Sequence, residues 1–214
     1  MYLPHHFEEK DAGVLHALIR AHPLGTWVTA AEGGLIANHL PFLLHPDRGP
    51  CGTLVGHVAR ANVAWRSFSR TIPSVVIFQG PEAYVTPSWY PSKQEHGKVV
   101  PTWNYAVVHA HGIPTAIEDP AWLLAHVTEL TRVHESAEEK PWAVGDAPRE
   151  FIDKMLAAIV GIEIPIEALE GKWKVNQNRE PQDQRGAAAG LERRGTPESA
   201  EMAGLVRARS KPLP

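Results

Sequence analysis

Glycine and proline residues cut the first half of this 214-residue chain into short segments that alternate apolar and polar residues. Segments of this length between turn residues are typical of antiparallel strands. Near the other end, Ile162, Ile164 and Ile166 share one face of a further segment, 161–169. The sequence thus predicts strands over 24–30, 35–45 with a break at Pro41, 53–58, 74–79, 83–86, 102–117 with a bend at 112–114, and 161–169.

Helices are predicted before, among and after these strands. Asp119-Pro120 is a typical helix start, with an acceptor at the N-cap and proline in the first turn. Short strands combined with helices predict an α+β protein built around an antiparallel β-barrel with peripheral helices. The expected helices lie over 14–22, 62–68, 120–134, 151–159, 181–193 and 196–208.

The segment from Tyr84 to Gly112 carries three of the four tyrosines and two of the seven tryptophans, among hydroxyl, amide and ammonium side chains. A site for a flat, anionic, partly polar ligand needs both kinds of group, because aromatic rings cover its face and polar groups fix its edge. The alternative is a long β-hairpin whose aromatic side chains pack across strands while its lysines are solvated. The residues alone leave both interpretations open.

Six sequence motifs resemble those of the PaiB family, the FMN-binding negative transcriptional regulators. In chain order they are MYLPHHF, IANHLPFLL, GHVARAN, YVTPSWYPSK, VPTWNYAVVHAHG and GKWKVNQNR, and the resemblance runs from Met1 to about Leu191. The family usually reads Ser-Gln-Asn-Arg where this chain has Asn176-Gln177-Asn178-Arg179. Asparagine keeps a hydrogen-bonding side chain at that position.

The resemblance implies the FMN-binding split β-barrel of the pyridoxamine-phosphate-oxidase-like flavoproteins, as a homodimer with FMN in the groove between the subunits. We expect residues 1–170 to form this domain with its flanking helices. Residues 171–214 would then be a C-terminal extension, made of a flavin-edge motif at 171–179 and a basic helical arm.

Candidate FMN ligands fall in two early segments. Arg60 suits the phosphate because a guanidinium binds it bidentately, and His57 and Asn62 lie on the same short segment. Alternatively, Asn62 caps a helix and Arg60 is solvated. Asn38, His39 and Leu40 resemble the strand whose backbone contacts the flavin ring in this fold; otherwise they form a half-buried strand kinked by Pro41.

The later candidates belong to the aromatic segment and to the motif after it. Trp103 and Asn104 are expected to form the wall contributed by the second subunit. Tyr90 and Lys93, on the preceding loop, accompany this wall. The last candidates supply amides and an ammonium group that suit a flavin edge or phosphate, and they are Lys174, Gln177 and Asn178. They could equally hold a dimer contact.

Several other classes of site find little support in the sequence. Cys51 is the only cysteine, which excludes an internal disulfide. His109 and His111 have the spacing of a metal pair on one strand face, but no carboxylate or third histidine is near them in sequence, so we expect no metal. We find no catalytic triad and name no catalytic residue. With no apolar run of membrane-spanning length and no signal peptide, we expect a cytoplasmic protein that binds no membrane.

The resemblance favours a negative transcriptional regulator with FMN and operator DNA as partners. Residues 171–214 carry nine Lys or Arg against five Asp or Glu, in a chain of net charge −3, so the extension could face DNA. No helix-turn-helix is evident, which keeps open a flavin-dependent oxidoreductase. A third alternative, a haem or small-ligand scavenger, is supported only by the twelve histidines.

Overall fold

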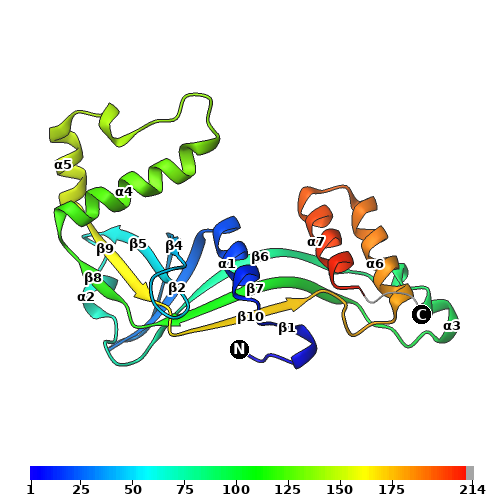
Figure 1. The fold of residues 1–214 in the computed structure, drawn as a ribbon. Coiled ribbons are helices and arrows are strands. Elements are labelled where there is room, and N and C mark those ends of the chain that lie inside the picture. Colours follow the sequence, from blue (N-terminus) through cyan, green and yellow to red (C-terminus); the bar gives the residue numbers. More distant parts are fainter. Residues whose placement is uncertain (211–214) are drawn as a thin grey trace. The chain divides into compact units, whose positions relative to one another are not determined.

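Antiparallel strands joined by turns form the sheets of the protein (Figure 1). The computed structural model describes residues 1–210. The strands are β1 (Glu8–Glu9), β2 (Leu24–Ala31), β3 (Gly34–Pro41), β4 (Leu43–His45), β5 (Thr53–Ala59), β6 (Ser74–Val85), β7 (Thr102–Gly112), β8 (Thr115–Ile117), β9 (Ile159–Pro165) and β10 (Ala168–Lys174). The helices are α1 (Ala12–Ala21), α2 (Ala64–Ser67), α3 (Ser92–His96), α4 (Pro120–His134), α5 (Arg149–Ala157), α6 (Pro181–Arg194) and α7 (Pro197–Ala208).

The chain folds as two units. The first holds Met1–Leu18, Gln79–His109 and the described chain from Glu170 onward, and the second holds Ile19–Phe78 and Ala110–Leu169. Strands β6, β7 and β10 each contribute residues to both. The expected division into residues 1–170 and 171–214 stays a prediction, and residues 211–214 lie outside the described part of the chain.

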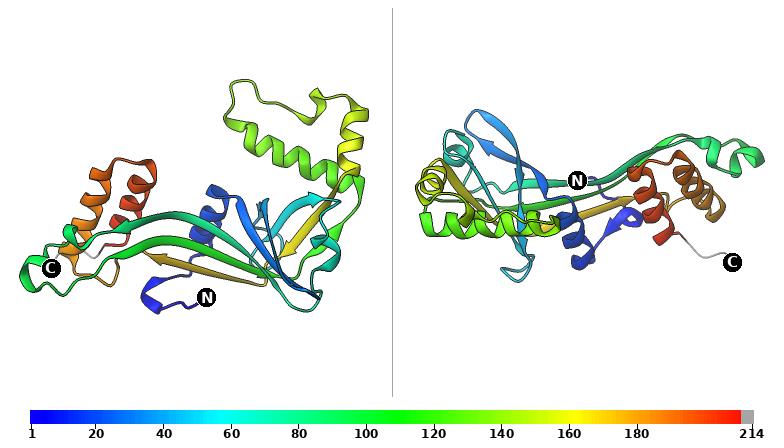
Figure 2. Two further views of the ribbon diagram at one scale, coloured as in Figure 1. Left: turned by 180° about the vertical axis from the view of Figure 1, so that it is seen from behind. Right: turned by 90° about the horizontal axis from the view of Figure 1, so that it is seen from above.

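In the first unit, the strands follow the order β1-β10-β7-β6, and Glu8 pairs with Lys172 in the antiparallel register of β1 and β10. Helices α6 and α7 lie side by side as a hairpin that turns at Gly195, whose φ is 75° (Figure 2). Glycine suits this left-handed position because it has no Cβ to clash. The Trp89 ring packs so closely on α6 that a Cβ at Gly190 would lie 2.1 Å from it.

In the second unit, one sheet runs β6-β2-β3 and another runs β4-β5-β9-β8. Ile162, Ile164 and Ile166 are fully buried, as their alternation predicts. The predicted helix start is confirmed, because the Asp119 carboxylate accepts hydrogen bonds from the first-turn amides of α4 at 3.2 and 3.4 Å. Helices α4 and α5 pack together through Leu123, Ile152 and Leu156.

Two of the expected boundaries are wrong. The predicted strands 74–79 and 83–86 form one strand, β6, because Gly80 lets Leu18 and Ala106 approach its backbone: a Cβ there would lie 2.8 Å from Leu18 Cδ1. The predicted strand 161–169 is instead divided between β9 and β10, after Pro165. Among residues 1–210, no helix is long and apolar enough to cross a membrane.

Candidate functional site

The predicted FMN ligands divide into two sets, one in each unit. In the second unit, β3 carries Asn38, His39 and Leu40, with Leu40 buried and His39 exposed on the opposite face. The Asn38 Oδ1 accepts a 2.7 Å hydrogen bond from Asn62 Nδ2. The Asn38 Nδ2 is buried and has no hydrogen-bond partner in the described chain. Burying an amide N–H without a partner costs free energy, so this atom marks a place where a ligand carbonyl would be stabilising.

The GHVARAN motif supplies the other members of this set. Asn62 Oδ1 accepts a 2.9 Å hydrogen bond from the amide of Ala64, the first residue of α2, so its side chain joins the start of that helix to β3. The N-cap residue of α2 is Val63, so Asn62 makes this bond from the position before the cap. Ligand binding by Asn62 stays a prediction.

The Arg60 guanidinium already has protein partners. Its Nε donates to Ala157 O at 2.8 Å, its Nη2 donates to Ile159 O at 3.1 Å, and its Nη1 donates to the Glu118 carboxylate. Arg60 thus donates to a carbonyl group at the C-terminal end of α5, where carbonyl groups lack partners within the helix. A phosphate on Arg60 would have to share the guanidinium with these acceptors.

His57 lies beside a second histidine that the sequence did not single out. Its Nδ1 is 3.0 Å from Nε2 of His126 on α4, and the His126 ring stacks on Trp122. Burial lowers the pKa of His57. Burial, with smaller contributions from the charges of His57 and His45, lowers the pKa of His126 to about 4. Because both rings are disfavoured as cations, His57 would offer a phosphate a hydrogen bond rather than a charge.

In the first unit, a buried chain of amides links three of the motifs. Asn104 Nδ2 donates to Asn176 Oδ1, and Asn176 Nδ2 donates to the Tyr90 hydroxyl at 2.8 Å. Asn176 has a φ of 70°, a left-handed conformation that asparagine tolerates better than most residues. The asparagine that replaces the family's serine therefore suits this backbone conformation, and Asn176 joins the candidate set although it was not among the predicted site residues. Asn104 Oδ1 is buried without a hydrogen-bond partner in the described residues.

Positive charge gathers around this network. Lys174 Nζ donates to Trp103 O at 2.7 Å and to the Thr102 hydroxyl. Burial first, and then the nearby charges of Lys172 and Arg179, lower the Lys174 pKa. The Arg179 guanidinium lies 5.2 Å from the Tyr90 ring centre, which is cation–π contact.

The remaining candidates of this unit occupy different environments. Trp103 is 54% exposed and meets Tyr84 edge to face, with ring centres 6.0 Å apart. Lys93 and Asn178 are exposed, and Lys93 Nζ reaches the Ser88 hydroxyl at 3.4 Å. Gln177 Oε1 accepts from the Val175 amide at 2.8 Å, so its side chain supports the turn after β10.

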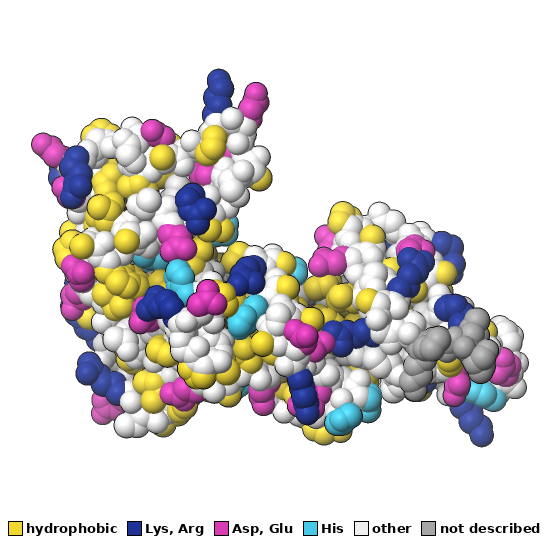
Figure 3. All heavy atoms as spheres, viewed as in Figure 1, with side chains coloured by type: hydrophobic (Ala, Val, Ile, Leu, Met, Phe, Trp, Pro, Cys, Tyr) yellow, Lys and Arg dark blue, Asp and Glu magenta, His cyan; other side chains and the backbone are white. Residues whose placement is uncertain are grey.

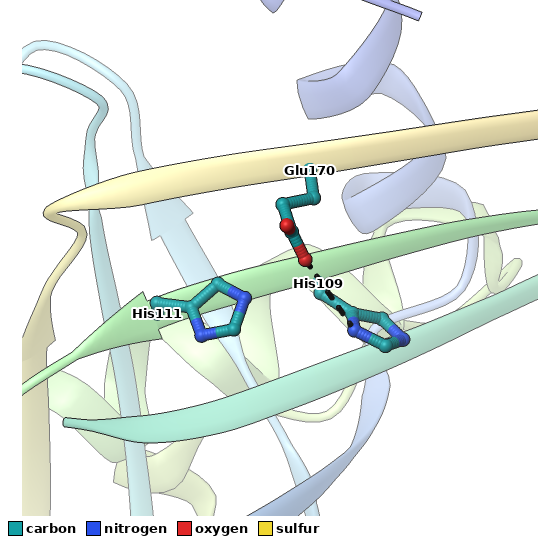
Figure 4. Close-up of side chains that lie close together, drawn as sticks. All are labelled: His109, His111 and Glu170. Atoms are coloured by element: carbon teal, nitrogen blue, oxygen red, sulfur yellow. Dashed lines mark ion pairs between the residues drawn. The ribbon is translucent and has the colours of Figure 1, made fainter. Parts of the chain in front are cut away.

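The histidine pair considered for metal binding has a carboxylate beside it, because one ligand atom from each of His109, His111 and Glu170 lies within 4.8 Å of the other two. His109 Nδ1 lies 3.9 Å from Glu170 Oε2, and Glu170 also accepts a 2.8 Å bond from the Met1 ammonium group (Figure 4). His111 follows His109 by two residues on β7. Glu170 lies far from both histidines in sequence, so no local pattern indicated that a carboxylate would lie beside them in the structure.

Comparisons with known proteins agree with the predicted family. The family model described as "Putative FMN-binding domain" matches residues 1–168. The chain is 30% identical, over 96% of its length and 96% of the relative's, to the protease synthase and sporulation protein PAI 2 of Bacillus subtilis. It is 32% identical to the uncharacterized protein AN0679 of Emericella nidulans, over 99% of this chain and 98% of that one.

Solved structures agree with the predicted fold. The flavocytochrome Anf3 of Azotobacter vinelandii matches with a TM-score of 0.58 at 14% identity, over 79% of this chain and 70% of that one. The FAD and heme binding protein of Mycobacterium smegmatis matches with a TM-score of 0.55 at 18% identity, over 78% and 73%. The predicted α+β split-barrel fold is thus confirmed, as is FMN as the cofactor that the family model describes. By its sequence, the chain belongs to the PaiB family of FMN-binding proteins.

Proposed function

We propose that this protein is a PaiB-type negative transcriptional regulator that binds FMN between the two subunits of a homodimer. The observation that carries the FMN site is the buried Asn38 Nδ2 with no partner among the described residues. The edge of the flavin ring presents carbonyl oxygens, which are the acceptors that such an amide lacks. His39 and Asn62 flank it in sequence or in space and add hydrogen-bonding groups.

Exposed apolar side chains are the reason to propose a dimer. In the first unit Trp103, Tyr84 and Val100 are 54%, 40% and 62% exposed, and in the second unit Leu35 and Val63 are 78% and 68% exposed. Large apolar side chains near a polar site are stabilised when a ligand ring or a partner covers them. Within the proposal, Trp103 of one subunit covers the flavin held by Asn38 of the other.

The buried and exposed candidates would have different roles toward FMN. Asn104 is fully buried and bonded to Asn176, so it would hold the neighbouring Trp103 in place rather than contact the ligand. Lys174, Lys93 and Arg60 are the cations that a phosphate could use. When bound, FMN supplies a redox-active ring, and its occupancy would favour the assembled dimer by mass action.

The first test is the visible absorption spectrum of the purified protein after FMN addition and dialysis, followed by titration with FMN and with riboflavin. Retained flavin absorbance and tighter binding of FMN than of riboflavin are expected, because only FMN carries the phosphate. Lys174→Met, Lys93→Met and Arg60→Gln then identify the phosphate ligand, since its loss removes the preference for FMN and leaves riboflavin binding unchanged. Lys98→Met is the matched control, because Lys98 is exposed and outside the candidate set. If no flavin is retained, the cofactor site is refuted.

The regulatory role is tested separately from cofactor binding. Arg185 and Arg193 are exposed on α6 and would contact the DNA phosphates. Apo and FMN-loaded protein are compared for oligomeric state and for affinity to DNA selected from a random-sequence pool. Equal oligomeric state and equal DNA affinity in both forms would contradict the mechanism. NADH or NADPH oxidation well above the rate with free FMN would instead identify the flavin-dependent oxidoreductase.

A further inference from the structure

The second unit contains a cavity of about 720 Å³ where α4 and α5 approach the segment after β5. Sites for small molecules have volumes of roughly 300–1,000 Å³, so this one is large enough for a ligand. Its walls are formed by Arg60, Glu118, Pro120, Ala121, Leu123, Leu124, Arg149, Asp153, Leu156 and Ala157. The family comparison assigns no role to this cavity.

One side of the cavity is apolar. Leu123 of α4 and Leu156 of α5 are 1% and 6% exposed, and Leu124 is half-buried beside them. Figure 3 shows hydrophobic side chains among charged side chains of both signs over α4 and α5. Because Leu123 and Leu156 are already almost fully buried, an apolar ligand group placed here would remove from water its own surface and part of that of Leu124, which is favourable.

The other side of the cavity carries two ion pairs. Arg149 Nε lies 2.8 Å from Asp153 Oδ1 on α5. Arg60 bonds Glu118, and its other nitrogens donate to carbonyl groups at the end of α5 and the start of β9. A guanidinium has five N–H groups, so each arginine keeps donors beyond these bonds. The two arginines and two carboxylates leave the cavity with no net charge.

This charge balance narrows the class of ligand. A simple anion that approaches either arginine also meets the carboxylate paired with it, and a simple cation meets the arginine. A molecule that carries both a carboxylate and an ammonium group can bind one partner of each sign without leaving a charge uncompensated.

We propose that the cavity binds a small zwitterion with an apolar side chain, the class of the branched-chain and aromatic α-amino acids. The ligand carboxylate pairs with Arg149 or Arg60, its ammonium group pairs with Asp153 or Glu118, and its side chain lies on Leu123, Leu124 and Leu156.

The test is isothermal titration of the full-length protein with L-leucine and with L-phenylalanine. The singly charged counterparts of L-leucine, 4-methylpentanoate and 3-methylbutylamine, are titrated in parallel. We expect saturable binding of at least one amino acid, with each counterpart of leucine binding about ten-fold more weakly or worse, the equivalent of about 1.4 kcal/mol. The absence of saturable binding at millimolar amino acid overturns the proposal, and so does equal binding of either counterpart.

Two variants locate the binding, each with a control on α4 outside the cavity. Arg149→Gln removes one cation and should weaken binding about ten-fold, whereas Arg132→Gln at an exposed position should not. Ala121→Phe fills the cavity and should abolish binding, whereas Ala125→Phe, one turn further along the helix, should not. The Arg149–Asp153 pair is 73% and 52% exposed, so losing it should leave thermal unfolding nearly unchanged. If each variant and its control bind alike, the cavity is not the site.

Discussion

The buried histidine pair predicts a specific loss of stability in mild acid. His126 is 4% exposed, and its pKa is lowered from 6.5 to about 4. A histidine whose pKa is lowered in the folded state stabilises the fold fully above its unfolded pKa, and that stability is lost as the pH falls toward the folded value. The window therefore runs from about pH 6.5 down to about pH 4.

Linkage gives the size of the effect. With these two pKa values, lowering the pH from about 7 to about 5 reduces the free energy of unfolding by about 2 kcal/mol through His126 alone. The neighbouring histidines also disfavour the protonated form of His126. His57 of β5 shares a hydrogen bond with it, and the charges of His57 and His45 contribute to its lowered pKa. His45 of β4 lies 3.7 Å from Glu129.

The assay is urea unfolding at pH 7 and pH 5 for the wild type and for His126→Gln, which retains a hydrogen-bonding side chain but does not titrate. The wild type should lose about 2 kcal/mol more than the variant between the two pH values, whatever the variant's stability at pH 7. His134→Gln, at an exposed histidine of the same helix, is the control and should behave as the wild type. If the wild type and His126→Gln lose the same stability, the reasoning is refuted.

Two further predictions concern the first unit. Gly190→Ala should lower the melting temperature and reduce the free energy of unfolding by about 1–3 kcal/mol, because the new Cβ would lie 2.1 Å from the Trp89 ring. The control is Gly204→Ala on α7, where a Cβ would meet no atom within 4 Å. This variant should raise the free energy of unfolding by up to about 1 kcal/mol. Asn176→Ala should cost about 2–3 kcal/mol in urea unfolding, because alanine at φ 70° is strained and the Tyr90 hydroxyl loses its partner. Wild-type stability in Asn176→Ala would contradict the role given to the amide network.

The sequence correctly predicted those helices and strands that are determined by residues close together in the chain. The Asp119 cap and the alternating isoleucines of β9 depend on neighbouring residues, and both are in the structure as expected. From its sequence neighbours alone, Gly80 is interpreted as a break between two strands. In the structure β6 continues through it, because Leu18 and Ala106, which are distant in sequence, approach the backbone there. Contacts between distant residues, such as that of His57 with His126, leave no local signal at all.

Several residues in the motifs that identified the family also make contacts that stabilise the fold. Arg60 bonds the end of α5, Asn62 joins β3 to α2, and Asn176 takes a left-handed conformation that its side-chain bonds stabilise. A residue in a recognised motif can thus be required because the fold needs it, whether or not it contacts the cofactor. Loss of FMN binding in an Arg60 variant could result from a damaged fold or from a lost contact with the phosphate. The comparison of FMN with riboflavin separates them, because a damaged fold weakens the binding of both flavins, whereas a lost phosphate contact weakens only that of FMN.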